Sequence, residues 1–454
     1  MIHPNNQIAI IGAGFSGLAA ARILHQKGIS FQLFEARERL GGRVYTKQIQ
    51  DDLYLDLGGQ WIGPSQTRMY ELCQEYGVPY FETYNQGQSI LDLNGRIKSY
   101  KGTIPKLDII SLLNLDMIVR KLERMASKID LEKPWTHPKA QEFDGQTLLD
   151  FLKRNSKTEA CLQVMKVGMQ TIFACEPEEL SLLHALFYIK SGTSLDVLIS
   201  IKNGAQQHRI HGGMQTLAEA IAKPFFDRIQ FDSPVLSIIQ EKEKFTLSTS
   251  KGAQVFSHII FAVPPPLLKK IGINPPLSDQ KQKLLEGYEM GYIGKCQMVF
   301  AKPYWRHKNL SGQAVSDSEF YLQTIFDSSP ADSKYGVLMG FVIGNKARKF
   351  FQMDEDSRKQ AVKKQLIQYF GEEANQEINY VDHTMNQETW SEGCYAGIRG
   401  VNSWTKYQNS YSQSEGRLHF AGTEAATRWH GYIEGAVRAG EAAAEKILQE
   451  LSND

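Results

Sequence analysis

The stretch that decides the fold is Ile8-Ala9-Ile10-Ile11-Gly12-Ala13-Gly14-Phe15-Ser16-Gly17, a short apolar strand that runs into a G-x-G-x-x-G turn. Gly12 allows the tight turn, Gly14 lets the backbone approach a pyrophosphate, and Gly17 lets helix and strand pack closely. A helix follows and is expected to end near Gly28, a good C-cap. Its positive end would offer free backbone N–H groups to phosphates.

A second apolar strand, Phe31–Phe34, places Glu35 at its end. Glu35 lies 18 residues after Gly17, close to the spacing expected for a carboxylate that accepts a hydrogen bond from a ribose hydroxyl. Strand, glycine turn, helix, strand and acid together predict a dinucleotide-binding domain, against the alternative of an ordinary turn.

The totals limit the classes of protein that fit. The chain has 454 residues, enough for two domains. The formal net charge is +1, which gives no sign of a nucleic-acid or membrane-surface partner. Five cysteines stand alone, without a C-x-x-C pair, which argues against a disulfide framework or a zinc site. No apolar stretch is long enough to span a membrane, so we predict a cytoplasmic location.

Further motifs follow the first one in a characteristic order. E-A-R stands at Glu35–Arg37, G-G-R at Gly41–Arg43 and D-L-G-G at Asp56–Gly59. This order resembles the flavin-dependent amine oxidase family, with its monoamine and putrescine oxidases, and it goes with FAD rather than a nicotinamide. A plain NAD-binding domain is the alternative that these motifs alone leave open.

The resemblance implies an α/β fold, with a Rossmann-like FAD-binding domain of the glutathione-reductase and amine-oxidase type. That domain is expected to be discontinuous, formed by 1–80, 203–270 and 390–454. A substrate domain of mixed sheet and helices would comprise 81–202 and 271–389. Within these, the pattern predicts a helix pair over 107–129 and three helices between Gly145 and Lys190. One strand is predicted from Val255 to Val263.

The resemblance also assigns residues to the cofactor. Those expected to contact FAD are Gly12, Gly14, Ser16, Gly17, Glu35, Ala36, Arg37, Gly42, Arg43, Gly59, Gln60, Trp61, Val235, Trp390, Cys394, Gly422, Thr423, Glu424 and Ile433. Cys394 matches the cysteine that bonds to the flavin 8-methyl group in some members of the family. The next segment, Ala396–Gly400, departs from the proline-containing segment of those enzymes, so covalent attachment and a buried thiol both stay open.

The implied reaction transfers a hydride from the α-carbon of a primary amine to flavin N5. Reoxidation by O2 then gives aldehyde, ammonia and H2O2. The resemblance places Lys295 beside N5, where it would hold a water, whereas a solvated lysine at the start of a strand is the alternative. Tyr395 and Tyr432 match the two aromatic side chains that flank the amine path.

Other assignments depend on position in the family alone. Substrate-pocket candidates are Ile199, Gln206, Phe341, Thr171 and Ile172. No metal ligand is predicted, because His211, His419 and His430 show no ligand spacing and are interpreted as structural. The expected partners are a small-molecule amine, O2 and, by analogy, a second copy in a homodimer.

Three alternatives compete with a monoamine oxidase. An L-amino-acid oxidase would need an arginine for the substrate carboxylate, and no arginine stands out. A polyamine or putrescine oxidase would need a distant carboxylate, for which Glu319 and Glu176 are candidates. A flavin-binding protein without catalysis is opposed by the presence of Lys295 and both tyrosines.

Overall fold

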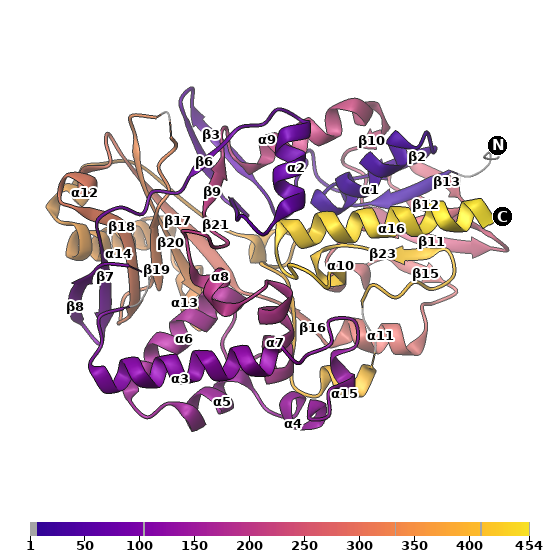
Figure 1. Cartoon of the computed structure of the whole chain (residues 1–454). Coiled ribbons are helices and arrows are strands. Elements are labelled where there is room, and N and C mark those ends of the chain that lie inside the picture. Colours follow the sequence, from indigo (N-terminus) through magenta and orange to yellow (C-terminus); the bar gives the residue numbers. More distant parts are fainter. Residues whose placement is uncertain (1–6, 103–104, 332, 409–410, 454) are drawn as a thin grey trace.

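The computed structural model describes residues 7–102, 105–331, 333–408 and 411–453. A five-stranded parallel sheet contains the first motif (Figure 1). Its strands follow the order β10 (Ile229–Gln230), β2 (Phe31–Phe34), β1 (Ile8–Ile11), β14 (His258–Phe261) and β23 (Leu418–Phe420). Both predicted strands, β1 and β2, are therefore present with their predicted bounds.

Helices cover one face of this sheet and a second sheet covers the other. Ile8, Ile10 and Ile260 pack with helices α1 (Phe15–Gln26), α9 (Met214–Ala222) and α16 (Ile433–Asn453). The opposite face packs on the four-stranded sheet of β13 (Gly252–Phe256), β12 (Lys244–Thr249), β11 (Val235–Glu241) and β15 (Gly272–Asn274). The alternation of side chains along buried strands produces this two-sided packing.

The prediction of one strand over Val255–Val263 is wrong. The segment contains the end of β13 and the whole of β14, which belong to different sheets. Ser257 separates them, and its backbone N–H donates to the carbonyl of Gln7, which directs the chain into the parallel sheet.

A seven-stranded sheet forms the other large layer, at the left in Figure 1. Its order is β21 (Glu377–Thr384), β17 (Ile293–Phe300), β20 (Gly336–Ile343), β19 (Thr324–Asp327), β18 (Leu310–Asp317), β7 (Gln88–Leu93) and β8 (Arg96–Tyr100). All residues of β17 and β20 are buried, and α14 (Glu355–Phe370) packs against this sheet. These two inner strands are therefore shielded on both faces.

The helical segment differs in one respect from its prediction. Residues 107–129 form one helix, α3 (Ile109–Ala126), rather than a pair. Asp108 caps it, and no glycine or proline interrupts it. The three helices predicted between Gly145 and Lys190 are confirmed as α5 (Leu148–Asn155), α6 (Glu159–Phe173) and α7 (Leu182–Ser191).

Short elements connect these layers. The strands are β3 (Thr46–Gln50), β4 (Leu53–Asp56), β5 (Trp61–Ile62), β6 (Tyr80–Glu82), β9 (His208–Ile210), β16 (Tyr288–Met290) and β22 (Gly397–Arg399). The helices are α2 (Thr67–Glu75), α4 (Ala140–Asp144), α8 (Leu195–Ile199), α10 (Pro265–Leu268), α11 (Asp279–Glu286), α12 (Tyr304–His307), α13 (Gly344–Phe350) and α15 (Ser403–Tyr407). Within the described residues, no helix has the length and apolar character needed to cross a membrane.

Candidate active site

One elongated pocket begins at the carboxyl ends of the parallel strands and reaches the seven-stranded sheet. At one end lie the glycine turn before α1 and the residue after β2, Glu35. At the other end lie Lys295 of β17 and Phe341 of β20. The end of a parallel sheet where strands give way to loops is the usual place for a nucleotide ligand.

The glycine turn leaves backbone donors directed at the pocket. Gly12 has φ +102° and a Cβ there would lie 2.8 Å from the carbonyl oxygen of Ala262. A Cβ on Gly17 would lie 1.9 Å from the carbonyl oxygen of Gly12, so α1 packs directly on the turn. The N-cap Gly14 supplies no side-chain cap to α1. The first N–H groups of α1 are thus available to an anion.

Glu35 is fixed at the end of β2. Its Oε2 accepts a hydrogen bond from the Ala13 N–H at 2.8 Å, and its Oε1 accepts one from the Arg37 N–H at 2.9 Å. Burial raises the pKa of Glu35, against the lowering effect of these N–H groups and of Arg37. A carboxylate held this way, on a pocket wall next to the phosphate turn, fits the ribose of a dinucleotide.

Arg43 and Glu424 form a buried pair between distant parts of the chain. Nη1 of Arg43 lies 2.6 Å from Oε1 of Glu424, and Nη2 lies 3.0 Å from Oε2. Arg43 also donates to the carbonyl of Tyr395, and the Gly397 N–H donates to Glu424. Burial acts to raise the pKa of Glu424, but Arg43 outweighs it and holds that pKa below its ordinary value.

Lys295 lies inside β17 and is 6% exposed. Its Nζ donates to three oxygens: the carbonyls of Asp56 (3.1 Å) and Gly58 (2.5 Å) and Oε1 of Gln60 (2.5 Å). These acceptors match the three N–H bonds of an ammonium. Burial lowers the pKa of Lys295 to about 7, although Asp56 opposes the shift. The interpretation as a solvated lysine is therefore wrong, and both protonation states are accessible near neutral pH.

Strand register explains why Lys295 has aromatic and basic neighbours. Lys295 pairs with Phe341 on β20 and with His383 on β21. All three line the pocket. Such cross-strand neighbours project side by side from one face of a sheet, so the three side chains form one floor of the pocket.

Aromatic rings form the adjoining walls. Tyr395 and Tyr432 both line the pocket. The rings of Tyr395 and Phe341 meet edge to face with centroids 6.1 Å apart, and the rings of Tyr188 and Tyr432 lie 6.0 Å apart. Burial raises the pKa values of Tyr395 and Tyr432, so both phenols are neutral at physiological pH.

Cys394 precedes Tyr395 and also lines the pocket. It is the one partly exposed cysteine of the five, and the other four are buried. Burial of its sulfur raises the pKa of Cys394 to about 12, despite Arg43 and Lys295 nearby. The thiol is therefore protonated at neutral pH, yet it faces the cavity.

Most of the predicted site residues lie together. Further predicted residues that line the pocket are Ser16, Ala36, Gly42, Gly59, Val235, Trp390, Gly422, Thr423 and Ile433. Gly17 and Glu424 are not among the lining residues. Gln60 contacts Lys295, and Trp61 has its ring centroid 5.8 Å from Nζ of Lys295. Of the five substrate-pocket candidates, Phe341 lines the pocket. The other four, Ile199, Gln206, Thr171 and Ile172, do not.

No sequence pattern indicated Glu388, a charged residue that holds two side chains of the pocket wall, Arg37 and His383. Glu388 pairs with Arg37 at 2.7 Å, Arg39 at 3.0 Å and His383 at 3.1 Å. Burial opposes ionisation, but His383, Arg39 and Arg37 together lower the pKa of Glu388 to about 2. Since Arg37 and Arg39 stand about 350 positions before Glu388 in the chain, only the fold brings them together.

Comparison with known proteins identifies a family whose sequence model matches most of this chain. The family model for flavin-containing amine oxidoreductases matches residues 15–448. AofH of Mycobacterium tuberculosis is 34% identical over 440 residues, covering 97% of this chain and 96% of that protein. The human flavin-containing amine oxidase B is 32% identical over 449 residues, covering 98% of this chain and 86% of that enzyme.

Solved structures agree with these relatives. A putrescine oxidase bound to putrescine superposes with a TM-score of 0.93 at 28% identity, covering 98% of this chain and all of the other. The cyclohexylamine oxidase of Brevibacterium oxydans superposes with a TM-score of 0.94 at 26% identity, covering 99% of this chain and all of the other.

Proposed function

Because the chain belongs to the family of flavin-containing amine oxidoreductases, we propose that its pocket binds FAD and oxidises a small primary amine. Bound FAD accepts a hydride from the carbon next to nitrogen and passes the electrons to O2, so that amine, O2 and water give aldehyde, ammonia and H2O2. The observation that carries the proposal is one continuous pocket. It joins the uncapped start of α1 to Lys295, Tyr395 and Tyr432.

The nucleotide half of the pocket fits FAD in three ways. The open N–H groups of α1 suit a pyrophosphate, and the carboxylate of Glu35 suits a ribose. The Cα atoms of Gly14 and Gly42 face each other, because a Cβ on Gly42 would lie 3.2 Å from Gly14 Cα. Side chains at either position would fill this part of the cradle, so the two glycines keep it open.

Lys295 is the residue that we propose to handle protons. Its Nζ is held by Asp56, Gly58 and Gln60, so its position does not depend on substrate. A lysine whose pKa lies near 7 can give or take a proton at neutral pH with little cost. We propose that Nζ exchanges one of these three hydrogen bonds for one to the water that hydrolyses the imine product, and shares its proton with that water.

Tyr395, Tyr432 and Phe341 are proposed to line the amine's approach. Phe341 is buried and the two tyrosines are half-buried. Loss of contact with solvent raises the pKa of both phenols and keeps them uncharged. An uncharged aromatic slot receives a neutral amine more readily than a carboxylate. The reactive form of the substrate is the neutral amine, since its nitrogen lone pair must be free.

The arginines that line the pocket help to distinguish an amine substrate from an amino-acid substrate. Among the described residues that line it, Arg37 and Arg43 are the two arginines, and each is already paired with a carboxylate. An L-amino-acid oxidase requires an arginine for its substrate carboxylate. Glu176 and Glu319 do not line the pocket either. These observations support a monoamine over an amino acid or a diamine.

Cys394 offers a point of attachment for the flavin ring, and we propose a direct test of it. The protein is precipitated with acid, and the colour of pellet and supernatant is compared with that of Cys394→Ser. A yellow wild-type pellet beside a colourless variant pellet establishes the covalent bond. Yellow supernatants from both show that FAD is held without one.

We also propose the two domains and the homodimer that the sequence predicts. The discontinuous FAD-binding part would comprise 1–80, 203–270 and 390–454, and the substrate part the remainder. A homodimer in the cytoplasm would be the working form, and light scattering of the purified protein measures its mass.

The central experiment measures H2O2 release over a panel of benzylamine, cyclohexylamine, putrescine and L-amino acids. We expect turnover of a primary monoamine and none of L-amino acids. Lys295→Met should lower the rate by at least about tenfold. Lys281→Met is the matched control, because Lys281 is also buried but donates to Tyr411 and Gln413 outside the pocket. Equal loss in both variants, or preference for an amino acid, would contradict the proposal.

A further inference from the structure

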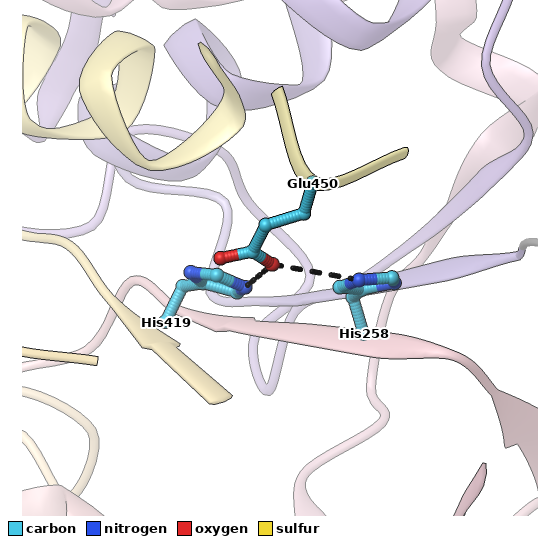
Figure 2. A group of neighbouring side chains, drawn as sticks. All are labelled: His258, His419 and Glu450. Carbon is cyan, nitrogen blue, oxygen red and sulfur yellow. Dashed lines mark ion pairs between the residues drawn. The ribbon is translucent and has the colours of Figure 1, made fainter. Parts of the chain in front are cut away.

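A cluster of three potential metal ligands lies away from the pocket. It consists of His258, His419 and Glu450 (Figure 2). Within the part of the chain that the structure describes, it is the one group of at least three such side chains whose ligand atoms converge, all within 4.8 Å of one another. None of the three lines the pocket, so the proposed oxidase reaction does not account for them.

The fold brings the two histidines to one face of the parallel sheet. His258 begins β14, and His419 pairs with Ile260 of that strand. Side chains alternate along a strand, so His258 and Ile260 share a face, and His419 shares it on the next strand. Their rings stack with centroids 6.0 Å apart at an interplanar angle of 24°. Both imidazoles are 1% exposed.

Helix α16 brings the third ligand. It packs on the same face, where Ile447 belongs to the core with Ile260, and Glu450 follows one turn later. Figure 2 shows the Glu450 carboxylate pointing toward both imidazoles. Glu450 also lies in the last turn of α16, where the helix carbonyls add negative potential. The face therefore combines two imidazole nitrogens with a carboxylate at an electronegative helix end.

Two of the three distances between ligand atoms are close to those around a tetrahedral ion, and all three are within 4.8 Å. Glu450 Oε2 lies 3.3 Å from Nε2 of His419 and 3.6 Å from Nε2 of His258. Bonds of about 2.0–2.1 Å from Zn²⁺ to nitrogen or oxygen place tetrahedral ligands roughly 3.3 Å apart. The side chain of Glu450 is 35% exposed, so solvent can reach a fourth position.

Serine hydroxyls hold the other nitrogen of each ring. Ser257 Oγ donates to the carbonyl of Gln7 and lies 3.0 Å from Nδ1 of His258. His419 Nδ1 lies 3.1 Å from Ser414 Oγ. Such outer hydrogen bonds orient histidine ligands in metal sites.

We propose that His258, His419 and Glu450 bind one divalent transition-metal ion, with Zn²⁺ the best match to two imidazoles and one carboxylate. The ion ties the last turn of α16 to strands β14 and β23. Glu450 stands 17 positions after the pocket residue Ile433, about 25 Å along the helix. The ion is therefore structural and takes no part in the oxidation.

The test uses the full-length, flavin-loaded protein. After removal of metals by EDTA, equilibrium dialysis against Zn²⁺ with elemental analysis counts bound ions. We expect one Zn²⁺ per chain, and a rise in melting temperature when it binds. His419→Ala and Glu450→Gln should each weaken binding by at least about tenfold. Glu450→Gln is the safer variant, because it keeps the shape of a partly exposed side chain.

His307→Ala is the matched control, because it removes an exposed imidazole on α12, outside the cluster. It should leave both the stoichiometry and the melting shift unchanged. The proposal is overturned if the wild type binds no Zn²⁺ at equilibrium with about 100 μM free ion, a concentration high enough to fill even a weak site. It is equally overturned if Glu450→Gln binds as tightly as the wild type.

Discussion

The pair of Arg43 and Glu424 allows a quantitative test of how the pocket is held. The side chain of Glu424 is fully buried and that of Arg43 is 19% exposed. Glu424→Gln keeps the shape and one acceptor for the Gly397 N–H, but it leaves the Arg43 charge buried without its counterion. Removing one partner of a buried pair costs about 3–5 kcal/mol.

That cost converts into a melting shift. At about 2.1 cal/mol/K per residue, 454 residues give an unfolding entropy near 1 kcal/mol/K. We therefore expect Glu424→Gln to melt about 3–5 °C below the wild type if the chain unfolds as one unit. Differential scanning calorimetry of the flavin-loaded protein measures this shift.

A double-mutant cycle separates the pair from other effects. Arg43→Met alone leaves Glu424 buried and charged, whereas the double variant removes both charges. The double variant should be more stable than the sum of the two single losses by about 1 kcal/mol or more. Strictly additive losses would refute the reasoning. So would a Glu424→Gln protein whose melting temperature lies within about 1 °C of that of the wild type, a difference on the order of the measurement error.

Three further outcomes follow from the structure. Folded Lys295 loses its proton near pH 7 and the unfolded chain near 10.5, so the unfolded state binds more protons between these values and stability rises with pH there. The wild type should therefore gain stability relative to Lys295→Met as pH rises across that window. Melting temperatures of both proteins from about pH 7 to about pH 10 measure this gain. Parallel curves of melting temperature against pH would contradict it. Gly17→Ala places a Cβ 1.9 Å from the carbonyl oxygen of Gly12 and should abolish flavin binding, which flavin absorbance measures. Gly168→Ala in α6 meets no atom within 4 Å and should stabilise the folded protein by about 1 kcal/mol, which the melting temperature measures. Tyr395→Leu should lower kcat/KM for an aromatic amine by roughly three- to tenfold, and Tyr395→Phe should retain it; equal losses would show that the ring is not the cause.

The sequence predicted best where local rules decide the structure. The strand β1, the glycine turn, α1 and β2 follow from patterns within 30 residues, and the bounds of both strands are confirmed. The family and its cofactor are confirmed as well, because motifs at Glu35, Gly42 and Asp56 stand in a fixed order. The roles of individual site residues stay predictions, although most of those residues share one pocket.

Interactions over long separations were not predictable. His383 lines the pocket through the register of β21 against β17, and Glu388 pairs with Arg37 and Arg39 beside it. The sequence favours a structural role for His419, because the residues that the fold brings to it, His258 and Glu450, lie far from it in the chain and form no local ligand pattern. Ser257 separates β13 from β14 although both flanking segments favour strands. Each case depends on which strands become neighbours, and a linear pattern does not contain that information.

The parallel sheet also has a consequence for biosynthesis. Its last strand, β23, begins only at Leu418, and pocket residues continue to Ala436. A ribosome must therefore synthesise the chain through Ala436 before the last strand and the pocket lining are complete. We therefore expect flavin capture to follow synthesis of these residues, and a message truncated before Leu418 to yield a colourless product.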